Sequence, residues 1–474
     1  MQRSLATQTT EQIGKTVLLK GWVDSIRKHG PVAFIDLRDR SGLVQVVLSG
    51  DLLERANTIK SEFVIEITGT VAARSDKYIN EKLETGTVEV SANSLEIINS
   101  ADVLPFPIDT DGHEIDEDLR LEYRYLDLRR KRLNHHLKIR SRVAQFVRNW
   151  LISKDFVEIE TPVLTKSTPE GARDFLVPSR LQAGKFYALP QSPQQYKQML
   201  MVSGFERYFQ LARCFRDEDP RSDRAYAEFT QIDIELSFTT QEEIITLTEA
   251  MFTEMVETLF PDKHIQQKPW PRISYKDSME KYGNDKPDIR SDPNDPNELA
   301  FAWVVDFPLF TPQSADDYYH GSGKAAFAPS HHMFTAPHPD DALLLETDPT
   351  AVRGLQHDLV LNGHEVGGGS IRIHDAKVQE KIFELIGFTK EQNQEFAHML
   401  RAFTFGVPPH GGVAPGLDRL LYTILGETSL REVMAFPTQA SGKTAIMNAP
   451  STVTDEQLKE LHIEVSKTAE KNLR

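Results

Sequence analysis

The sequence predicts an α+β protein with a small five-stranded β-barrel at its N-terminal end and a larger domain built on an antiparallel sheet. Residues 16–100 contain five short runs in which apolar and polar residues alternate, separated by turn residues such as Gly30-Pro31 and Ser41-Gly42. Beyond residue 136, long strand patterns occur without strict alternation with helices, which favours α+β over a doubly wound parallel sheet. At 474 residues the chain is long enough for more than one hydrophobic core.

These patterns divide the chain into three parts. Residues 1–103 form the barrel, with strands expected at 16–26, 32–39, 43–50, 63–74 and 86–98. The Pro- and Asp-rich residues 104–135 interrupt the periodicity and are expected to form a hinge. Residues 136–474 form the second domain, in which the clearest strand patterns lie at 157–165, 207–219, 227–238 and 357–374 and the clearest helical patterns at 133–156, 241–260, 378–388 and 416–426.

A five-stranded barrel of this size is typical of oligonucleotide-binding (OB) folds, whose open face offers aromatic and polar side chains to unstacked bases. Phe34 and Gln45 lie on the second and third predicted strands, where they could stack on a base and hydrogen-bond to it. A lone aromatic residue in a strand is more simply explained as a core residue, so the strand pattern alone favours burial of Phe34.

The composition indicates a soluble protein. Hydrophobic residues make up 39% of the chain and charged residues 26%, and no segment approaches the roughly 18 apolar residues of a membrane span. The single cysteine, Cys214, excludes an intrachain disulfide and a cysteine-cluster metal site, and we expect it to be a small buried residue. The first residues lack the apolar segment of a signal peptide, so a cytoplasmic location is expected.

The charge of the chain is acidic overall and basic in one place. A net charge of -16 argues against a protein that coats nucleic acid indiscriminately. Residues 120–142 nevertheless contain nine Lys or Arg side chains and two acidic ones. This basic run is either the solvated side of a helix and its lead-in or a surface that contacts phosphates, and the sequence leaves both interpretations open.

The strand pattern at 207–219 ends in a group of charged residues. A polar loop and a return strand follow, which predicts a hairpin. Arg216 and Glu218 are two residues apart, so in extended structure both side chains leave the same face of the sheet. A guanidinium there can hold a phosphate through paired hydrogen bonds, and the carboxylate can accept a hydrogen bond from an amine such as adenine N6. Alone, this spacing is more typical of a surface ion pair.

A glycine-rich run from Asn362 to Arg372 lies inside the strand pattern at 357–374. Glycine weakens a strand, so some group must approach this backbone closely. Asp358 and Glu365 are seven residues apart and need a bulge or turn to face one site. A Mg²⁺ ion that also binds substrate phosphates would suit these two carboxylates. The spacing alone does not establish this role. The run lacks the lysine of a P-loop and the glycine order of a dinucleotide-binding fold.

The last of these stretches begins a helix after the turn-rich residues 408–415. Arg419 lies in the first turn of that predicted helix, where the positive end of the dipole would favour a triphosphate. Alone, it is more simply explained as an arginine on the helix surface.

In their order and spacing, these stretches resemble the signature motifs of class II aminoacyl-tRNA synthetases. Residues 155–165 resemble motif 1, residues 215–219 with their return strand resemble motif 2, and residues 416–420 resemble motif 3. Residues 168–180, 187–200, 228–238, 303–310 and 362–374 more closely resemble the bacterial-type aspartyl-tRNA synthetase family. The likeness covers nearly the whole chain.

The resemblance implies an ATP- and Mg²⁺-dependent ligase that activates L-aspartate as aspartyl-adenylate and transfers it to the 3′ end of tRNA(Asp). The implied ATP-binding residues are Arg216, Asp217, Glu218, Phe229, Glu365, Gly416, Leu417, Asp418 and Arg419, among which Arg216, Glu365 and Arg419 are the implied catalytic residues. The implied metal ligands are Asp358 and Glu365. The implied aspartate-binding residues are Glu170, Ser192, Gln194, Lys197, Arg216, Gln231, Asp233, His331, His332, Gly367 and Arg372.

The resemblance places Lys197 and Arg372 around the side-chain carboxylate of aspartate. With two cations facing one carboxylate, a neutral asparagine amide would leave buried positive charge uncompensated. The resemblance also implies that motif 1 builds the interface of a homodimer.

The barrel is implied to bind the tRNA anticodon through Arg27, His29, Phe34 and Gln45. His29 stands where family members that charge both tRNA(Asp) and tRNA(Asn) often carry histidine, so our hypothesis is that this chain charges both. Val47 stands where the family often has an aromatic residue, which weakens stacking on the third strand.

Two further departures distinguish the chain from the bacterial pattern. The motif 2 loop has one extra residue, which leaves its contacts with the acceptor end of tRNA undefined. Only the twelve residues 291–302 separate the segments between which bacterial enzymes insert a whole domain, so that domain is expected to be absent. The alternatives are an asparaginyl- or lysyl-tRNA synthetase, or a synthetase-like tRNA-binding protein without ligase activity.

Overall fold

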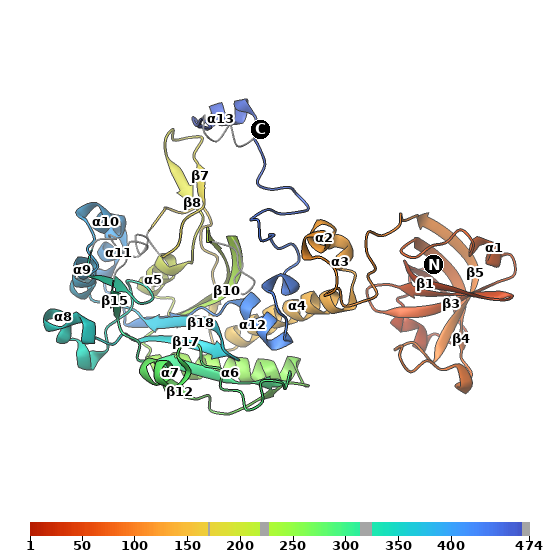
Figure 1. Cartoon of the computed structure of the whole chain (residues 1–474), viewed down its shortest axis with the longest axis horizontal. Helices are drawn as coiled ribbons and strands as arrows, with labels where there is room; N and C mark the ends of the chain where they lie inside the picture. The colour runs from red at the N-terminus through yellow and green to blue at the C-terminus, as the bar shows by residue number, and fades with distance from the viewer. Residues whose placement is uncertain (169–170, 219–226, 313–324, 467–474) are drawn as a thin grey trace. The chain divides into compact units, whose positions relative to one another are not determined.

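The computed structural model describes residues 1–168, 171–218, 227–312 and 325–466 of the chain. They form two compact units, Met1–Pro107 and Ile108–Arg474 (Figure 1). Residues 108–135, which the sequence placed in a hinge, belong to the second unit. The reason is that Arg120, Arg124 and Arg130 are buried there.

The first unit is a closed barrel in which the strands neighbour one another in the order β1-β2-β3-β5-β4. The strands are β1 (Thr16–His29), β2 (Val32–Arg38), β3 (Leu43–Ser49), β4 (Val64–Ala73) and β5 (Val88–Asn99), with the short helix α1 (Leu52–Arg55) between β3 and β4. Burial alternates along β2, so Ala33 and Ile35 point into the core. Phe34 lies between them and is only partly buried, so the expectation that it belongs to the core is wrong.

The second unit is built on an eight-stranded sheet in the order β12-β14-β17-β18-β19-β10-β9-β6. The six central strands pair antiparallel, as expected, and the two outer strands pair parallel with their neighbours. The bounds are β6 (Val157–Glu158), β9 (Arg207–Arg216), β10 (Ala227–Ser237), β12 (Arg272–Ser274), β14 (Phe301–Val305), β17 (Gln356–Leu361), β18 (His364–Ile371) and β19 (His410–Val413). Three two-stranded ribbons accompany it, formed by β7 (Leu176–Pro178) with β8 (Phe186–Ala188), β11 (His264–Ile265) with β13 (Glu298–Leu299), and β15 (Phe310–Pro312) with β16 (Phe327–Pro329).

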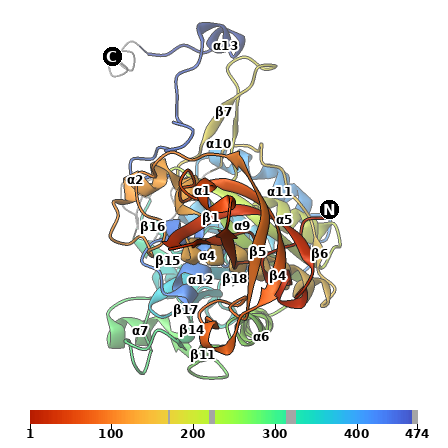
Figure 2. The ribbon, with the colours of Figure 1, turned by 90° about the vertical axis from the view of Figure 1, so that its right-hand side faces the viewer.

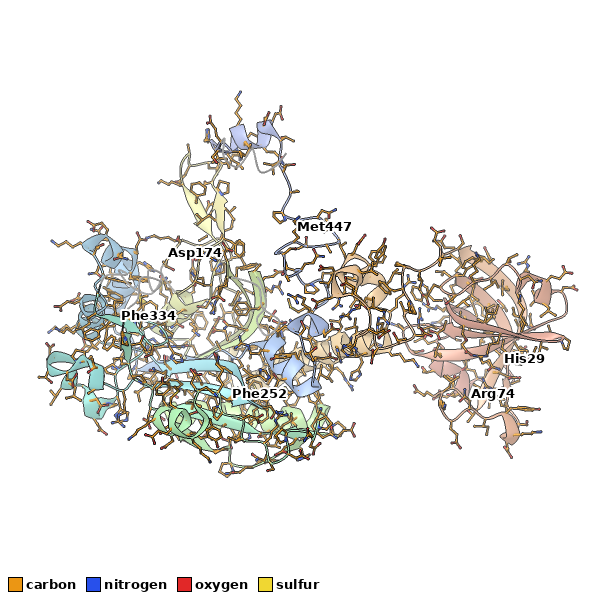
Figure 3. All side chains as sticks on the ribbon, viewed as in Figure 1. His29, Arg74, Asp174, Phe252, Phe334 and Met447 are labelled. Atoms are coloured by element: carbon orange, nitrogen blue, oxygen red, sulfur yellow. The ribbon has the colours of Figure 1, made fainter. Side chains whose placement is uncertain are left out.

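Helices α4 (Lys131–Ile152), α6 (Gln241–Leu259) and α12 (Leu417–Leu425) contribute to the main hydrophobic core of this unit. The other α-helices of the unit are α2 (Glu117–Glu122), α3 (Arg124–Asp127), α5 (Gln194–Val202), α7 (Tyr275–Tyr282), α8 (Leu344–Thr347), α9 (Ala376–Leu385), α10 (Lys390–Glu395), α11 (Ala397–Phe403) and α13 (Asp455–Glu460). Helix α6 begins with a capping box between Thr240 and Glu243 and buries Phe252 against the sheet (Figure 3). Helices α9 and α11 pack around a separate cluster that includes Phe334.

Two expected strands differ from the structure. The pattern at 357–374 is a hairpin rather than one strand, because Asn362 and Gly363 have φ of 49° and 81° and form a two-residue turn between β17 and β18. The pattern at 157–165 yields only β6, which pairs with β9 on one side. An edge strand gains few ladder hydrogen bonds, and Pro162 has no amide proton to extend them.

The basic run at 120–142 is partly buried, at Arg120, Arg124 and Arg130, and partly an exposed helix face, at Lys131, Lys138 and Arg142. Arg120 donates to Glu432 at 2.6 Å, and Arg124 and Arg130 donate to Asp127 at 2.8 and 2.6 Å. Glu432, on the short helix at Leu430–Val433, also accepts from Arg132, at 2.8 Å. Ion pairing within the protein therefore accounts for Arg120, Arg124, Arg130 and Arg132.

A hairpin formed by β7 and β8 extends from the body of the second unit in both views (Figures 1 and 2). None of the helices in the described part of the chain is long and apolar enough to span a membrane.

Candidate active site

A buried cluster of four charged side chains lies between α5 and the middle of the sheet. Lys197 of α5 donates to Asp233 Oδ1 at 2.6 Å and lies 3.3 Å from Glu235 Oε2. Arg372, which follows β18, donates two hydrogen bonds to Glu235, at 3.0 and 3.1 Å. Each of these four residues exposes 2% of its surface or less, so every charge depends on its partners in the cluster.

The two carboxyl groups of this cluster respond differently to the same surroundings. Burial raises the pKa of Asp233 above its ordinary value, and the attraction of Lys197 does not fully offset it. Burial also acts on Glu235, but Arg372 and Lys197 outweigh it and hold the pKa of that carboxyl below its ordinary value. Glu235 therefore stays ionised and fixes both cations.

Sequence reasoning missed Glu235, although the signal was present. Gln231, Asp233 and Glu235 alternate with apolar residues along β10, so their side chains share one face of the strand. Two acidic residues on the inner face of a central strand require partners, and Lys197 and Arg372 are those partners. The two cations are thus already compensated by two anions, which corrects the expectation that they face a ligand uncompensated.

His331 and His332 connect this cluster with a second one. Arg372 Nη1 lies 2.7 Å from His332 Nε2, and burial together with the charge of Arg372 holds the pKa of His332 well below its ordinary value. His331 Nε2 lies 2.8 Å from Asp358 Oδ1, and that carboxylate outweighs the effect of burial and raises the pKa of His331. Adjacent histidines thus contact the two clusters, and their pKa values shift in opposite directions.

The second cluster is carried by the β17–β18 hairpin. The pairing register shifts between Leu359 and Val360, and this bulge lets Asp358 and Glu365 act on one site, as their spacing required. Burial, and then the nearby Asp358 carboxylate, raise the pKa of Glu365. Two crowded carboxyl groups of this kind are suited to a cation. Among the described residues, no group of three or more His, Cys, Asp or Glu side chains forms a complete metal cage.

The glycine run is close-packed against neighbouring protein groups. A Cβ atom on Gly367 would lie 2.7 Å from Pro415 Cα, and one on Gly368 would lie 2.9 Å from Asp358 Oδ1. A Cβ atom on Gly412 of β19 would lie 2.2 Å from Glu235 Oε2. The glycines therefore leave room for the carboxylates of the two clusters.

Helix α12 brings Arg419 to the hairpin, while its first two residues stabilise the fold. Arg419 Nη1 donates to the backbone oxygen of Glu365 at 2.6 Å. Leu417 is buried in the main core, and Asp418 accepts from Arg140 at 2.5 Å and from the Thr230 amide at 2.8 Å. The side chains of Leu417 and Asp418 are thus occupied within the protein, so the ATP contacts predicted for these residues would have to come from their backbone. Gly416 forms an isolated bridge with Gln231.

The end of β9 carries the remaining nucleotide-binding candidates. The guanidinium of Arg216 lies over the ring of Phe229, 5.1 Å from its centroid, and Arg216 Nε is buried without a hydrogen-bond partner among the described residues. The strand ends at Arg216, so Glu218 lies beyond it. Asp217 is held through its backbone, since its amide donates to the Arg173 oxygen at 3.0 Å. Cys214, as expected, is buried, and its Sγ lies 3.2 Å from Gln231 Oε1.

The last candidates lie around α5. Gln194 donates to Gln198 Oε1 at 3.1 Å, on the buried side of the helix that carries Lys197. Ser192 precedes the helix and lines a pocket of about 400 Å³ with Asp174, which Figure 3 labels near the base of the β7–β8 hairpin. Glu170 lies outside the described residues.

In the first unit, the four anticodon candidates gather on the outer surface of the barrel. Arg27 is paired with Phe34 across β1 and β2, and the Phe34 ring lies 6.2 Å from that of His29, which ends β1 (Figure 3). Gln45 Nε2 lies 3.4 Å from a Glu89 oxygen. Asp36, which sequence reasoning missed, accepts two hydrogen bonds from Arg27, at 2.8 and 3.2 Å. Its alternation with Phe34 along β2 could have indicated it.

Comparison with known families identifies both units. Residues 17–98 match the OB-fold nucleic acid binding domain, and residues 116–440 match the tRNA synthetases class II (D, K and N). The second match covers well over half of the chain, so the chain belongs to the class II tRNA synthetases of this group.

Similar sequences narrow the class to one family. The chain is 39% identical to the aspartate–tRNA(Asp/Asn) ligase of Rubrobacter xylanophilus, over 95% of this chain and 94% of that protein. It is 40% identical to the aspartate–tRNA ligase of Bacillus licheniformis, over 97% of this chain and 98% of that protein. The chain belongs to the bacterial-type aspartate–tRNA ligase family.

The same alignments bear on chain length. The alignment with the Rubrobacter protein runs over 578 positions, and this chain has 474 residues, so the difference of at least 104 positions has no counterpart here. This is consistent with the expected absence of a bacterial insertion domain.

Solved structures share the fold. The aspartyl-tRNA synthetase of Entamoeba histolytica superposes with a TM-score of 0.71 at 24% identity, covering 92% of this chain and 91% of that one. The asparaginyl-tRNA synthetase of Pyrococcus horikoshii, solved with asparaginyl-adenylate, gives 0.72 at 23% identity, covering 92% and 98%. The fold alone therefore does not separate aspartate from asparagine enzymes.

Proposed function

We propose that this chain is an aspartate–tRNA ligase that joins L-aspartate to tRNA(Asp) at the expense of ATP. The observation that carries the proposal is the buried pair of cations, Lys197 and Arg372, held by Asp233 and Glu235 beside the carboxylates of the β17–β18 hairpin. A site of this kind, in a chain about 40% identical to aspartate–tRNA ligases, suits an amino acid with a carboxylate side chain.

The reaction has two steps. A carboxylate oxygen of aspartate attacks the α-phosphorus of ATP, the bond to the leaving pyrophosphate breaks, and aspartyl-adenylate forms. A hydroxyl of the terminal adenosine of tRNA then attacks the carbonyl of the mixed anhydride, and AMP leaves. Such chemistry requires alignment and stabilisation of charge rather than a protein nucleophile.

Arginine side chains supply this stabilisation in our proposal. Arg216 would bind the α-phosphate, because its buried Nε–H donor has no acceptor among the described residues. Phe229, under the same guanidinium, would stack on adenine, and Glu218 would accept from the adenine amine. Arg419 would bind the γ-phosphate at the start of α12.

A Mg²⁺ ion fits the hairpin carboxylates. Burial and the neighbouring Asp358 carboxylate raise the pKa of Glu365, and a divalent cation would relieve the repulsion between the two carboxylates. Asp358 and Glu365 would hold the ion, and it would supply charge neutralisation for the phosphates. The chain's own contribution is to keep both carboxylates in place through the bulge in the hairpin.

Lys197 and Arg372 would bind the side-chain carboxylate of aspartate, while Asp233 and Gln231 would lie near its ammonium group together with Glu170, Gln194 and Ser192. His331, His332 and Gly367 would complete the pocket. Replacing Lys197 by alanine should abolish aspartate-dependent exchange of pyrophosphate with ATP. Full exchange in that variant would refute the assignment of the amino-acid pocket.

The barrel would bind the anticodon through Arg27, His29, Phe34 and Gln45, and we propose that tRNA(Asn) is a substrate as well as tRNA(Asp). Support comes from His29 and from the name of the Rubrobacter relative, which states both tRNAs. Charging transcripts of the two tRNAs tests this, and failure to charge tRNA(Asn) would reject the broader specificity.

We also propose a homodimer, built with the motif 1 segment. Ile152, at the end of the preceding helix, and Val157, within the segment, expose 56% and 44% of their surface, which suits an interface. Sedimentation should give about twice the 53.7 kDa mass of the chain.

The decisive experiment is ATP–pyrophosphate exchange with aspartate, asparagine or lysine as the only amino acid. Exchange that requires aspartate supports the proposal, whereas exchange with asparagine or lysine identifies the neighbouring enzymes of the group. Absence of exchange with all three, while tRNA still binds, would identify a binding protein without ligase activity.

A further inference from the structure

The short connection at 291–302 is fastened to the tip of the β17–β18 hairpin. Asn362, in the turn of that hairpin, accepts from the Ala300 amide at 2.8 Å and donates to the Glu298 backbone oxygen at 3.0 Å. The backbone amide of Asn362 donates to the backbone oxygen of Ala300 at 3.2 Å. The side chain and the backbone amide of Asn362 thus join the hairpin to two residues of the connection.

The connection itself is closed by a buried carboxylate. Glu298 exposes 4% of its surface, and its two oxygens accept from the backbone amides of Ser291 and Asp292 at 2.7 and 2.9 Å. Gln266 donates to Ser291 Oγ at 3.0 Å from outside the connection. These bonds fix the short connection as a defined element, so it can serve as an anchor.

The other side of the hairpin turn is also held. A Cβ atom on Gly363 would lie 3.2 Å from the Cβ atom of Asp288, so the turn packs directly on the residues that lead into the connection. His364 Nδ1 lies 2.8 Å from the hydroxyl of Tyr422, which belongs to α12, the helix that carries Arg419. The tip of the hairpin is therefore fixed between the connection and α12.

The position of this tip determines where Glu365 points. Glu365 comes three residues after Asn362 and directly before the bulge that aligns it with Asp358. In a strand, a displacement of one residue moves every side chain to the opposite face. An anchor at the turn therefore acts together with the pairing of β17 and β18 to keep the two carboxylates in one site.

We propose that Asn362 is a positioning residue, which anchors the β17–β18 hairpin on the short connection and thereby holds Glu365 in register with Asp358 for a divalent cation and the phosphates of ATP. This inference rests on the proposed function of the carboxylate pair. In this chain the anchoring contacts of Asn362 come from residues of the short connection at 291–302.

The test replaces Asn362 by aspartate and, separately, Glu298 by glutamine. Asn362→Asp keeps the size of the side chain and tolerates the left-handed turn but removes the donor to Glu298. Asn448→Asp is the matched control, because Asn448 is also left-handed, with φ of 51°, and is exposed. Each full-length variant is titrated with Mg²⁺ in the aspartate-dependent exchange assay, and with Mn²⁺ plus ATP by electron paramagnetic resonance to measure bound metal.

For Asn362→Asp we expect the half-saturating concentrations of Mg²⁺ and of Mn²⁺ to rise about tenfold, the lower end of the effect that is typical when a group that orients a metal ligand is lost. The KM for aspartate should change less than about twofold, since Lys197 and Arg372 do not contact the hairpin turn. Glu298→Gln should shift the metal dependence in the same direction, and Asn448→Asp should behave as wild type.

Unchanged metal dependence in Asn362→Asp, or an equal loss of metal and aspartate affinity, would overturn the proposal. Failure of both variants to fold would also overturn it, because the contact would then serve folding rather than positioning. Absence of aspartate-dependent exchange in the wild type would instead refute the proposed function.

Discussion

Glu235→Gln removes the charge that holds both buried cations while nearly preserving the shape of the side chain. Glu235 accepts two hydrogen bonds from Arg372 and lies 3.3 Å from Lys197 Nζ, and the side chains of all three are at most 2% exposed. Removing one member of a buried ion pair costs about 3–5 kcal/mol, because the remaining charge stays uncompensated. A unit spanning Ile108–Arg474 has an unfolding entropy of about 0.8 kcal/mol/K, so its thermal midpoint should fall by about 4–6 °C.

Differential scanning calorimetry of the full chain measures this shift. Glu228→Gln is the matched control, since Glu228 lies on the same strand, and its ion pair with Arg213 leaves the two side chains 39% and 44% exposed. Exposed pairs of this kind contribute about 0–1 kcal/mol, so the control should shift the midpoint by about 1 °C or less. Equal shifts in the two variants would refute the claim that Glu235 supports the buried cluster.

Two further predictions concern other ion pairs. Burial acts to raise the pKa of Glu432, but Arg120 and Arg132 outweigh it and bring that pKa from 4.5 down to about 2. The stability that Glu432 contributes is therefore present above pH 4.5 and is lost as the pH falls toward 2. By pH 4 the wild type should lose about 1 kcal/mol of unfolding free energy that Glu432→Gln does not lose, as measured by urea denaturation; parallel pH profiles would exclude this contribution. Asp36→Asn should raise the KM for tRNA about fivefold by releasing Arg27 while pyrophosphate exchange stays unchanged, and an unchanged KM would exclude a role in anticodon binding.

The sequence predicted the fold well where local patterns determine it. The barrel strands, α6 and α12 follow from alternation, helical periodicity and capping, which act within a few residues. The hairpin at 357–374 was predicted as one strand, although the Asn362-Gly363 pair is a strong local turn signal that the continuous apolar and glycine pattern obscured. Strand β6 was overestimated because its length depends on a partner strand distant in the sequence.

The site was harder to predict because its charges are paired over long distances in the sequence. The link between Arg120 and Glu432 joins residues 312 positions apart, and nothing near either residue indicates the other. Motif resemblance could select Lys197 and Arg372 as ligand-binding residues, but it could not show that Glu235 occupies much of their hydrogen-bonding capacity. Buried charges are satisfied by tertiary contacts, which a sequence pattern does not specify.

This pairing changes the explanation of how asparagine is refused. Two cations and two anions balance in the cluster, so net charge does not distinguish the side chains, but donor number does. Within the described part of the structure, Arg372 uses four of its five N–H donors and Lys197 contacts two acceptors with three donors, which leaves one donor on each. A carboxylate can accept from both, whereas the amide of asparagine would set its NH₂ group against one of them.

Lys197→Gln replaces a pure donor by a group that can also accept, so the ratio of kcat/KM for aspartate over asparagine in pyrophosphate exchange should fall at least about tenfold. An unchanged ratio would mean that the donors of Lys197 do not set the preference.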